Sequence, residues 1–241
     1  MAAGGSSSAA PMIISGPAMD FKASSTQTAD DKKTVFKVWL LGDSEVGKTS
    51  LMVKYVDNIF DQSYVETLGV AFMNKTVVVR GNKIEFAIWD LGGQKGFLNM
   101  LPLVCREARA ILFCFDLTKK SSLLSMKEWY QKAREVNKSA AAFLIGTKFD
   151  AFTSQPPEYI EEVSTLARRY AAAMKASLIF CSSSKGINIQ NIFRVVLAKA
   201  TKKICTVAQI SEIGHPILEY TNPAPKAVAA KAPSEGAAAS S

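Results

Sequence analysis

Residues 42–49 read GDSEVGKT and fit the pattern G-x-x-x-x-G-K-[ST]. The two glycines allow backbone N–H groups of a strand-to-helix turn to face phosphate oxygens, at a helix end whose dipole also favours negative charge. The Lys48 ammonium can reach the β- and γ-phosphates of a nucleotide, and the Thr49 hydroxyl can bind Mg²⁺. The segment predicts a nucleoside triphosphate site with Mg²⁺, but it leaves the base open, because kinases, ATPases and GTPases all use this loop.

The segments on either side of this loop have the composition that a phosphate loop requires. Residues 34–41, TVFKVWLL, form a β-branched and aromatic run that predicts a buried strand. After the loop, apolar residues recur at helical spacing from Leu51 to Val56 and predict a helix over residues 48–57. Strand, loop and helix follow in the required order, which argues against an ordinary glycine-rich turn.

Strands and helices alternate along the rest of the chain. Two extended segments, residues 70–80 and 83–91, flank Gly81-Asn82, a hairpin signal, so we expect them to pair antiparallel. Apolar runs predict further strands at residues 108–115, 141–146 and 177–181, and helical patterns lie at residues 121–136, 158–175 and 188–203. The alternation predicts an α/β fold with a six-stranded, mostly parallel sheet, one antiparallel edge strand and helices on both faces.

Length and composition favour one folded domain between two extensions. With 241 residues, 48% of them hydrophobic, the chain can bury one sizeable core. Residues 1–33 and 221–241 are dominated by Ala, Gly, Ser and Pro. We therefore expect a disordered N-terminal extension over residues 1–33, a domain at residues 34–205, and a mostly disordered C-terminal extension over residues 206–241.

The charged residues, the single histidine and the cysteines disfavour several classes of function. The chain has 29 Lys and Arg against 21 Asp and Glu, but the positive residues are scattered, so we expect no nucleic-acid partner. His215 is the only histidine, which excludes a metal site with two histidines and argues against a serine-hydrolase triad. Four cysteines without a Cys-x-x-Cys pair favour a reducing, cytoplasmic compartment. We expect neither a secretion signal nor a membrane span.

Two further groups of polar residues suit a γ-phosphate. In residues 89–94, WDLGGQ, Asp90 can reach the Mg²⁺ shell and the Gly93 amide can meet the γ-phosphate. Gln94 can orient the water molecule that attacks the γ-phosphate. Thr67, in the preceding loop, is a candidate for a second hydroxyl ligand of Mg²⁺. Taken singly, such a glutamine or threonine is more often a solvated loop residue, so both assignments depend on the phosphate loop.

Two later motifs identify the base. Residues 146–150 read GTKFD and residues 181–185 read CSSSK, and each motif begins where a predicted strand ends. The Asp150 carboxylate can accept hydrogen bonds from N1–H and the 2-amino group of guanine, a pair of donors that adenine lacks. The Ser184 N–H can face guanine O6. A lone loop aspartate is more often only solvated, but beside a phosphate loop this pair of motifs predicts guanine.

With these motifs in order between residues 34 and 204, the chain resembles the Ras superfamily of small GTPases. The domain would then be a G domain of the P-loop NTPase type. Within the superfamily, the segments KTSLMVKYV, ETLGVAFMNKT, IWDLGGQ, NMLPLVC, ILFCFDLT and GTKFD most resemble the septum-promoting and mitotic-exit GTPases of the septation initiation network. Residues 213–220, IGHPILEY, resemble the same family.

The resemblance implies a full set of site residues. Phe60 would pack against one face of guanine and Lys148 would lie over the other, with residues 60–69 and 90–104 as the two switch segments. The expected catalytic residues are Gln94 and Lys48, and the expected Mg²⁺ ligands are Thr49, Thr67 and Asp90. The expected residues for GTP or GDP are Asp43, Ser44, Glu45, Val46, Gly47, Lys48, Thr49, Ser50, Phe60, Thr67, Gly93, Thr147, Lys148, Asp150, Ser183, Ser184 and Lys185.

Three features depart from commoner patterns of the family. Thr147 replaces an asparagine and removes an amide that could tie the base loop to the phosphate loop, so affinity is expected to fall while specificity survives. Ser44 is small enough to leave room for an arginine from a partner. The last cysteine, Cys205, is far from a prenylation position, and Ala2 is not the glycine that myristoylation requires, so we expect no lipid anchor.

The resemblance implies a switch that binds and hydrolyses GTP and regulates mitotic exit, septation or cytokinesis. Its GTP state would recruit an effector, such as a kinase of a division pathway. Slow intrinsic turnover implies an activating protein, with an exchange factor or a scaffold as further partners. Protein partners would place it in the cytoplasm and at the spindle pole or centrosome.

Three other functions are compatible with a phosphate loop. A Rab-like vesicle-trafficking GTPase is the nearest alternative, since its core motifs overlap, but the expected absence of prenyl groups argues against it. A small-molecule kinase would need a lid with clustered arginines, which the sequence lacks. A scaffold that only holds nucleotide would not need Gln94 and Thr67.

Overall fold

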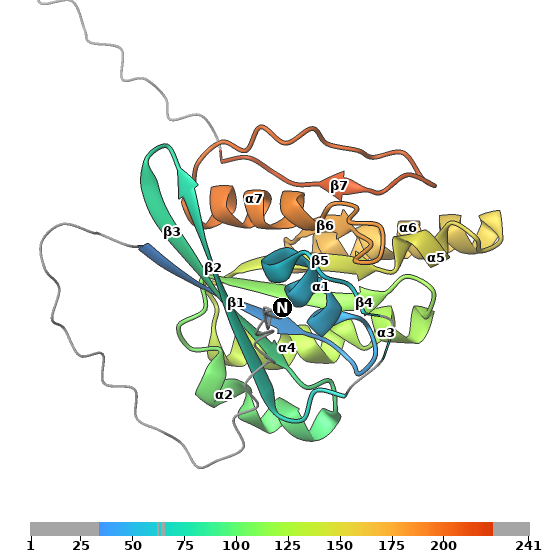
Figure 1. Cartoon of the computed structure of the whole chain (residues 1–241). Helices are drawn as coiled ribbons and strands as arrows, with labels where there is room; N and C mark the ends of the chain where they lie inside the picture. Colours follow the sequence, from blue (N-terminus) through green and yellow to red (C-terminus); the bar gives the residue numbers. More distant parts are fainter. Residues whose placement is uncertain (1–33, 62, 64–65, 224–241) are drawn as a thin grey trace, which may run out of the picture.

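The computed structural model describes residues 34–61, 63 and 66–223, and a seven-stranded sheet crosses this part of the chain (Figure 1). The strand order is β2-β3-β1-β4-β5-β6-β7. Strands β1, β3, β4, β5 and β6 are parallel to one another, whereas β2 and β7 pair antiparallel with β3 and β6 at the two edges. The strands are β1 (Thr34–Leu41), β2 (Val70–Val79), β3 (Asn82–Leu91), β4 (Ala110–Asp116), β5 (Ala141–Thr147), β6 (Ser177–Phe180) and β7 (Leu218–Glu219).

Helices cover both faces of the sheet, as predicted. Helices α1 and α7 lie on the near face in Figure 1, and α4 and α6 lie behind the sheet. The helices are α1 (Lys48–Asp57), the 3-10 helix η1 (Lys95–Met100), α2 (Leu101–Val104), α3 (Lys120–Leu124), α4 (Met126–Val136), α5 (Phe149–Phe152), α6 (Pro157–Met174) and α7 (Ile189–Ala200). None of the helices that the structure describes is long and apolar enough to cross a membrane.

The central strands read as apolar runs without alternation because both of their faces are covered. All seven residues of β4 are buried, and so are the last six residues of β5. The buried side chains form two clusters, one on each side of the sheet. Because the central strands are parallel, their carboxyl ends lie along the same side of the sheet. Loops at the carboxyl ends of such strands are where ligands bind in sheets of this kind.

The α/β prediction is confirmed, but the sheet has seven strands rather than six and two antiparallel edges rather than one. The additional strand, β7, comes from the segment predicted to be mostly disordered. Residues 206–223 instead pack on the domain, because Ile217 and Leu218 are fully buried and β6 would otherwise be an open edge. The folded part thus extends beyond residue 205. Residues 1–33 and 224–241, where disorder is also predicted, lie outside the described residues.

Two local predictions shift by small amounts. The hairpin loop is Arg80-Gly81 rather than Gly81-Asn82, since Val79 pairs with Asn82 and both loop residues have positive φ, 51° and 80°. Positive φ at both positions is what a type I′ turn requires. The helix predicted over residues 121–136 is divided into α3 and α4. The short helices η1, α2 and α5 were not predicted, because four to six residues are too few for a periodic pattern.

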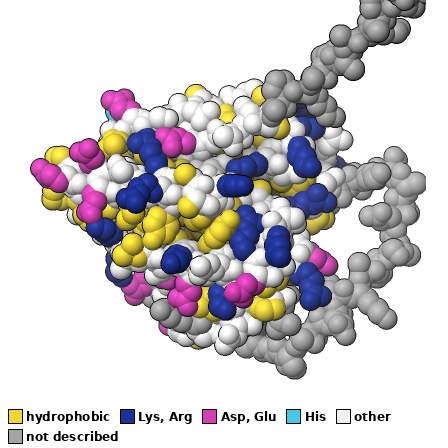
Figure 2. All heavy atoms as spheres, turned by 180° about the vertical axis from the view of Figure 1, so that it is seen from behind, with side chains coloured by type: hydrophobic (Ala, Val, Ile, Leu, Met, Phe, Trp, Pro, Cys, Tyr) yellow, Lys and Arg dark blue, Asp and Glu magenta, His cyan; other side chains and the backbone are white. Residues whose placement is uncertain are grey.

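The face seen from behind carries Lys and Arg side chains interspersed with hydrophobic and acidic ones (Figure 2). This distribution agrees with the scattered positions of Lys and Arg along the sequence. The face drawn in Figure 2 does not present the continuous positive groove that phosphate backbones favour.

Candidate functional site

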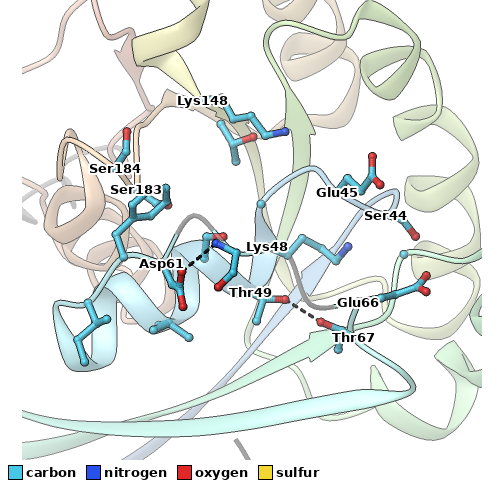
Figure 3. Close-up of a pocket in the computed structure, with 18 of the residues that line it drawn as sticks. Ser44, Glu45, Lys48, Thr49, Asp61, Glu66, Thr67, Lys148, Ser183 and Ser184 are labelled. Carbon is cyan, nitrogen blue, oxygen red and sulfur yellow. Dashed lines mark hydrogen bonds between the residues drawn. The ribbon is translucent and has the colours of Figure 1, made fainter. Parts of the chain in front are cut away.

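A cavity of about 550 Å³ opens at the carboxyl edge of the sheet, where β1, β3, β5 and β6 end. Figure 3 shows Ser183 and Ser184 at one end of this cavity and Thr67 at the other. Lys48 and Thr49 lie between them. The predicted residues that line the cavity are Ser44, Glu45, Gly47, Lys48, Thr49, Ser50, Phe60, Thr67, Gly93, Thr147, Lys148, Asp150, Ser183 and Ser184.

The loop of residues 42–49 wraps closely around the Lys48 side chain. Gly47 has φ 87° and leads directly into α1, a left-handed conformation that glycine adopts at little cost. At Gly42, a Cβ atom would lie 2.1 Å from the Cys114 carbonyl oxygen of the neighbouring strand β4, so only glycine fits. Lys48 Nζ donates to the carbonyls of Gly42 at 2.9 Å and Asp43 at 2.8 Å. The ammonium is thus fixed at the floor of the cavity.

Burial makes this ammonium a strong site for an anion. Desolvation lowers the pKa of Lys48, while the nearby Asp90 carboxylate opposes that change. The hydrogen bonds of Lys48 Nζ go to neutral carbonyls, and Asp90 offsets only part of the cost of burial, so a further negative charge beside the ammonium would be stabilising. The phosphates of a nucleotide would supply that charge at the cavity floor.

A cluster of three side-chain oxygens beside Lys48 fits a magnesium ion. Thr49 Oγ1 lies 2.8 Å from Thr67 Oγ1 and donates to Asp90 Oδ2. Asp90 is fully buried, burial raises its pKa, and its Oδ1 has no hydrogen-bond partner among the described residues. No group of three His, Cys, Asp or Glu side chains suited to a metal occurs in the described residues. Hydroxyls with one carboxylate are hard oxygen donors, which suit Mg²⁺ shared with phosphates.

The opposite end of the cavity holds the residues expected to read guanine. Asp150 accepts hydrogen bonds from Ser182 Oγ at 2.6 Å and Ser184 Oγ at 2.8 Å. Burial acts to raise the pKa of Asp150, but these two hydroxyls outweigh it and the pKa lies below its ordinary value. The carboxylate is therefore ionised at neutral pH and held in one place, as a reader of two N–H donors must be. Sequence reasoning missed Ser182, which is fully buried beneath the cavity.

Lys148 crosses the same end of the cavity in a conformation unusual for lysine. Its φ is 57°, and its Nζ lies 2.7 Å from Asp116 Oδ2 at the end of β4. Asp116 is buried and was not predicted as a site residue. A side chain tied down in this way presents its aliphatic stem to the cavity, as the flat face of a base requires.

Thr147 retains a link that was expected to be lost. Its hydroxyl lies 2.5 Å from the Val46 carbonyl in the phosphate loop and 2.9 Å from the Phe115 carbonyl. The base loop and the phosphate loop are therefore still joined, by a hydroxyl in place of an amide. Thr147 is buried, so the contact is shielded from water.

Replacing Thr147 with valine should speed the release of bound nucleotide about tenfold. Valine keeps the shape but leaves the Val46 carbonyl without its donor, and a buried unpaired group costs about 1–3 kcal/mol. Stopped-flow release of a fluorescent GDP analogue measures the effect. Thr147→Ser keeps the hydroxyl and should behave like the original chain; equal rates for the two variants would remove this contact from nucleotide binding.

The two predicted switch segments meet at the phosphate loop. A Cβ atom on Gly93 would lie 2.1 Å from the Ser44 backbone nitrogen, so the Gly93 backbone rests directly on that loop. Gly92 N donates to Gly69 O at 2.8 Å and ties the two segments to each other. A displacement of one switch segment would therefore strain or break its hydrogen bond to the other.

Five predicted residues do not line the cavity. Asp90 lies beneath it, and Val46 is buried within the phosphate loop. The Asp43 side chain turns away and accepts from Trp129 Nε1 at 2.8 Å, and Lys185 is exposed. Gln94 is exposed too, and its Nε2 donates to Glu66 Oε1 at 2.8 Å.

Several lining residues were not predicted. Phe60 lines the cavity as predicted and is 37% exposed, and the loop that carries it contributes more residues than expected. The unpredicted lining residues are Val53, Ile59, Asp61, Ser63, Glu66 and Ala151. Most of them lie near Phe60 and Thr67 along the chain, so their place in the loop that carries these two residues could have predicted that they line the cavity.

Comparison with known proteins agrees with this geometry. Residues 37–202 match the Ras family. The chain is also 56% identical over 194 residues to "Septum-promoting GTP-binding protein 1" of Schizosaccharomyces pombe, an alignment that covers 80% of this chain and 98% of that protein. Each motif of the cavity lies within the matched residues. The chain therefore belongs to the Ras family of small GTPases, which bind GTP and GDP and hydrolyse GTP.

Proposed function

We propose that this GTPase is a molecular switch that promotes septation and recruits an effector in its GTP state. The likeness to the septum-promoting protein carries the proposal, because it extends over nearly that whole protein rather than the shared motifs alone. Residues 213–220, IGHPILEY, also resemble this family in sequence, and Leu218 and Glu219 of this segment pair with β6.

Guanine and phosphates would bind at opposite ends of the cavity. Asp150 accepts from the donors of guanine, while Phe60 and Lys148 enclose the ring. Lys48 and the N-terminus of α1 hold the phosphates. Thr49, Thr67 and Asp90 would hold Mg²⁺, which neutralises charge on the phosphates when it is bound.

Switching would follow from the position of Thr67 and Gly93. Thr67 reaches the Mg²⁺ cluster from one switch segment, and Gly93 rests on the phosphate loop from the other. Loss of the γ-phosphate would remove what both segments bind, and their link at Gly92 and Gly69 would make them respond together.

Hydrolysis would require Gln94 to leave Glu66 and orient a water molecule. The water oxygen attacks the γ-phosphorus, the bond to the bridging oxygen breaks, and GDP leaves with the electron pair of that bond, while a proton of the water passes to the phosphate or to solvent. We propose intrinsic turnover on the order of 10⁻⁴ to 10⁻² per second, raised by an activating protein that inserts an arginine. Ser44 lines the cavity and is small enough to leave space for that arginine.

Partners and location follow from the proposed role. We propose a kinase of a division pathway as the effector, with an activating protein and an exchange factor or scaffold as regulators. These partners would hold the protein at the spindle pole or centrosome within the cytoplasm. A vesicle-trafficking role of the Rab type remains the second candidate, since the nucleotide site serves both roles equally.

Capture with the switch locked in each state should separate the two roles. Full-length protein loaded with a non-hydrolysable GTP analogue should retain a division-pathway kinase from extracts of dividing cells, and protein loaded with GDP should not. Retention of a tether or a coat protein in the GTP state would favour the trafficking role. Equal retention in both states would contradict the switch itself.

A further inference from the structure

The C-terminal segment, residues 206–223, lies against β6, the strand that leads into the guanine end of the cavity. Figure 1 shows β7 beside β6 and α7, with the chain returning along the edge of the sheet. The register pairs Leu178 with Glu219 and Ile179 with Leu218. A backbone hydrogen bond from Phe180 N to Ile217 O, 2.8 Å long, extends the pairing to the last residue of β6.

This segment is firmly anchored. Ile217 and Leu218 are fully buried and belong to the two different core clusters, so consecutive side chains fill opposite faces of the sheet. Removing such apolar side chains from water stabilises the position of the segment. Arg168 Nε and Nη2 also donate to Glu219 Oε1, at 3.0 and 2.8 Å. A segment held this strongly can restrain what it touches.

Asn188 joins this segment to the first turn of α7. Its Nδ2 donates to the Phe180 carbonyl at 2.9 Å and to the Pro216 carbonyl at 3.1 Å. Asn188 is the N-cap of α7 and has φ 58°, a conformation that asparagine, aspartate and glycine adopt more readily than other residues. One side chain thus links β6, the C-terminal segment and the start of a helix.

The loop between Phe180 and Asn188 is the one that holds Asp150. Ser182 N donates to Ile187 O at 3.1 Å and Ile187 N donates to Ser182 O at 3.0 Å, which closes the loop at its base. Within it, the Ser182 and Ser184 hydroxyls fix the Asp150 carboxylate. The contacts of Asn188 therefore lie directly outside the base of the guanine loop.

We propose that residues 216–219 clamp the guanine loop through Asn188 and so slow the release of bound GDP and GTP. Asn188 is a positioning residue, because it reaches the nucleotide only through the loop that it holds. The clamp rests on the proposed guanine site and adds to it a part of the chain that a minimal G domain lacks. It makes the C-terminal segment a determinant of how long each nucleotide state lasts.

Substitution of Asn188 in the full-length protein tests the clamp. Asn188→Asp keeps the side-chain shape and tolerates the positive φ, but loses both N–H donors; Asn188→Gly relaxes the backbone and removes the side chain. Each should release a fluorescent GDP analogue about tenfold faster than the original chain. The matched control is Asn222→Asp, since Asn222 bonds Cys205 at the far end of the same segment.

Three outcomes are informative. Faster release in both Asn188 variants, with Asn222→Asp unchanged at an equal loss in melting temperature, supports the clamp. Release within about twofold of the original chain in the Asn188 variants overturns it, as does an equal acceleration in the Asn222 control. Asp150→Asn, measured in parallel, separates the two claims: if it leaves GDP affinity unchanged, the guanine site itself is misassigned.

Discussion

Replacing Asp150 with asparagine should lower the affinity for GTP and GDP by about 10²- to 10⁴-fold. The carboxylate would accept two hydrogen bonds from guanine, each worth about 1.5–3 kcal/mol when one partner is charged. Asparagine offers an N–H₂ group where an acceptor is needed, and so faces the donors of guanine with another donor. The loss is large because both bonds depend on one side chain.

The same substitution should admit xanthine nucleotides. The 2-oxo group of xanthine accepts a hydrogen bond where guanine donates one, which matches the new amide. Ser182 and Ser184 hold the Asp150 carboxylate at 2.6 and 2.8 Å, and asparagine can keep its oxygen toward one of them. The amide should then point its nitrogen at the base.

Competition between GTP and XTP for the purified protein measures this exchange of specificity. Asp57→Asn is the matched control, because Asp57 is an exposed residue at the end of α1 and does not line the cavity. It should leave the affinity for both nucleotides unchanged. If Asp150→Asn binds GTP as tightly as the original chain does, the base is recognised elsewhere.

The phosphate loop and its flanks could be predicted because they are local. Residues 42–49 contain the glycines, the lysine and the threonine in one stretch, and the strand and helix beside them begin and end as predicted. The loop fixes its own geometry through short-range contacts, such as those of Lys48 Nζ with Gly42 and Asp43. A pattern read along the chain captures contacts of this kind.

Contacts between distant parts of the chain could not be predicted in the same way. Thr147 reaches Val46 across 101 residues, and Trp129 reaches Asp43 across 86. Which hydroxyl or indole donates to a given acceptor depends on how the helices and strands pack. The spacing of residues along the chain does not predict that packing. The role of Ser182 as a partner of Asp150 was missed for the same reason, although its neighbours Ser183 and Ser184 were named.

Strand β7 was missed because its signal is short and its burial unusual. A strand of two residues has no alternation to detect. Ile217 and Leu218 are both buried because each faces a different layer, so the pair has neither the alternation of a half-buried strand nor the length of a fully buried one. Only the completed sheet shows that β6 has an edge for these residues to cover.

Gln94→Leu should leave GTP affinity unchanged and lower intrinsic hydrolysis about 10²-fold. Gln94 does not line the cavity, so its loss removes no contact with bound nucleotide. Leucine has a similar size but can neither accept a hydrogen bond from water nor donate one to a phosphate oxygen. Loss of a well-placed orienting group costs about this factor when the attacking water is no longer aligned.

Single-turnover release of phosphate from preloaded GTP measures the rate, and nucleotide titration measures the affinity. An unaltered rate would remove Gln94 from the mechanism. Weaker binding at an unaltered rate would instead place its side chain on the nucleotide in the ground state.

The contact between Gln94 and Glu66 gives this prediction a second test. In the structure the Gln94 amide is held at 2.8 Å by a carboxylate on the other switch segment, so it must be released before it can meet the water. Glu66→Ala should therefore alter the hydrolysis rate only in a chain that retains Gln94. The double variant should match Gln94→Leu alone, because the two side chains act through one contact and their effects are not additive.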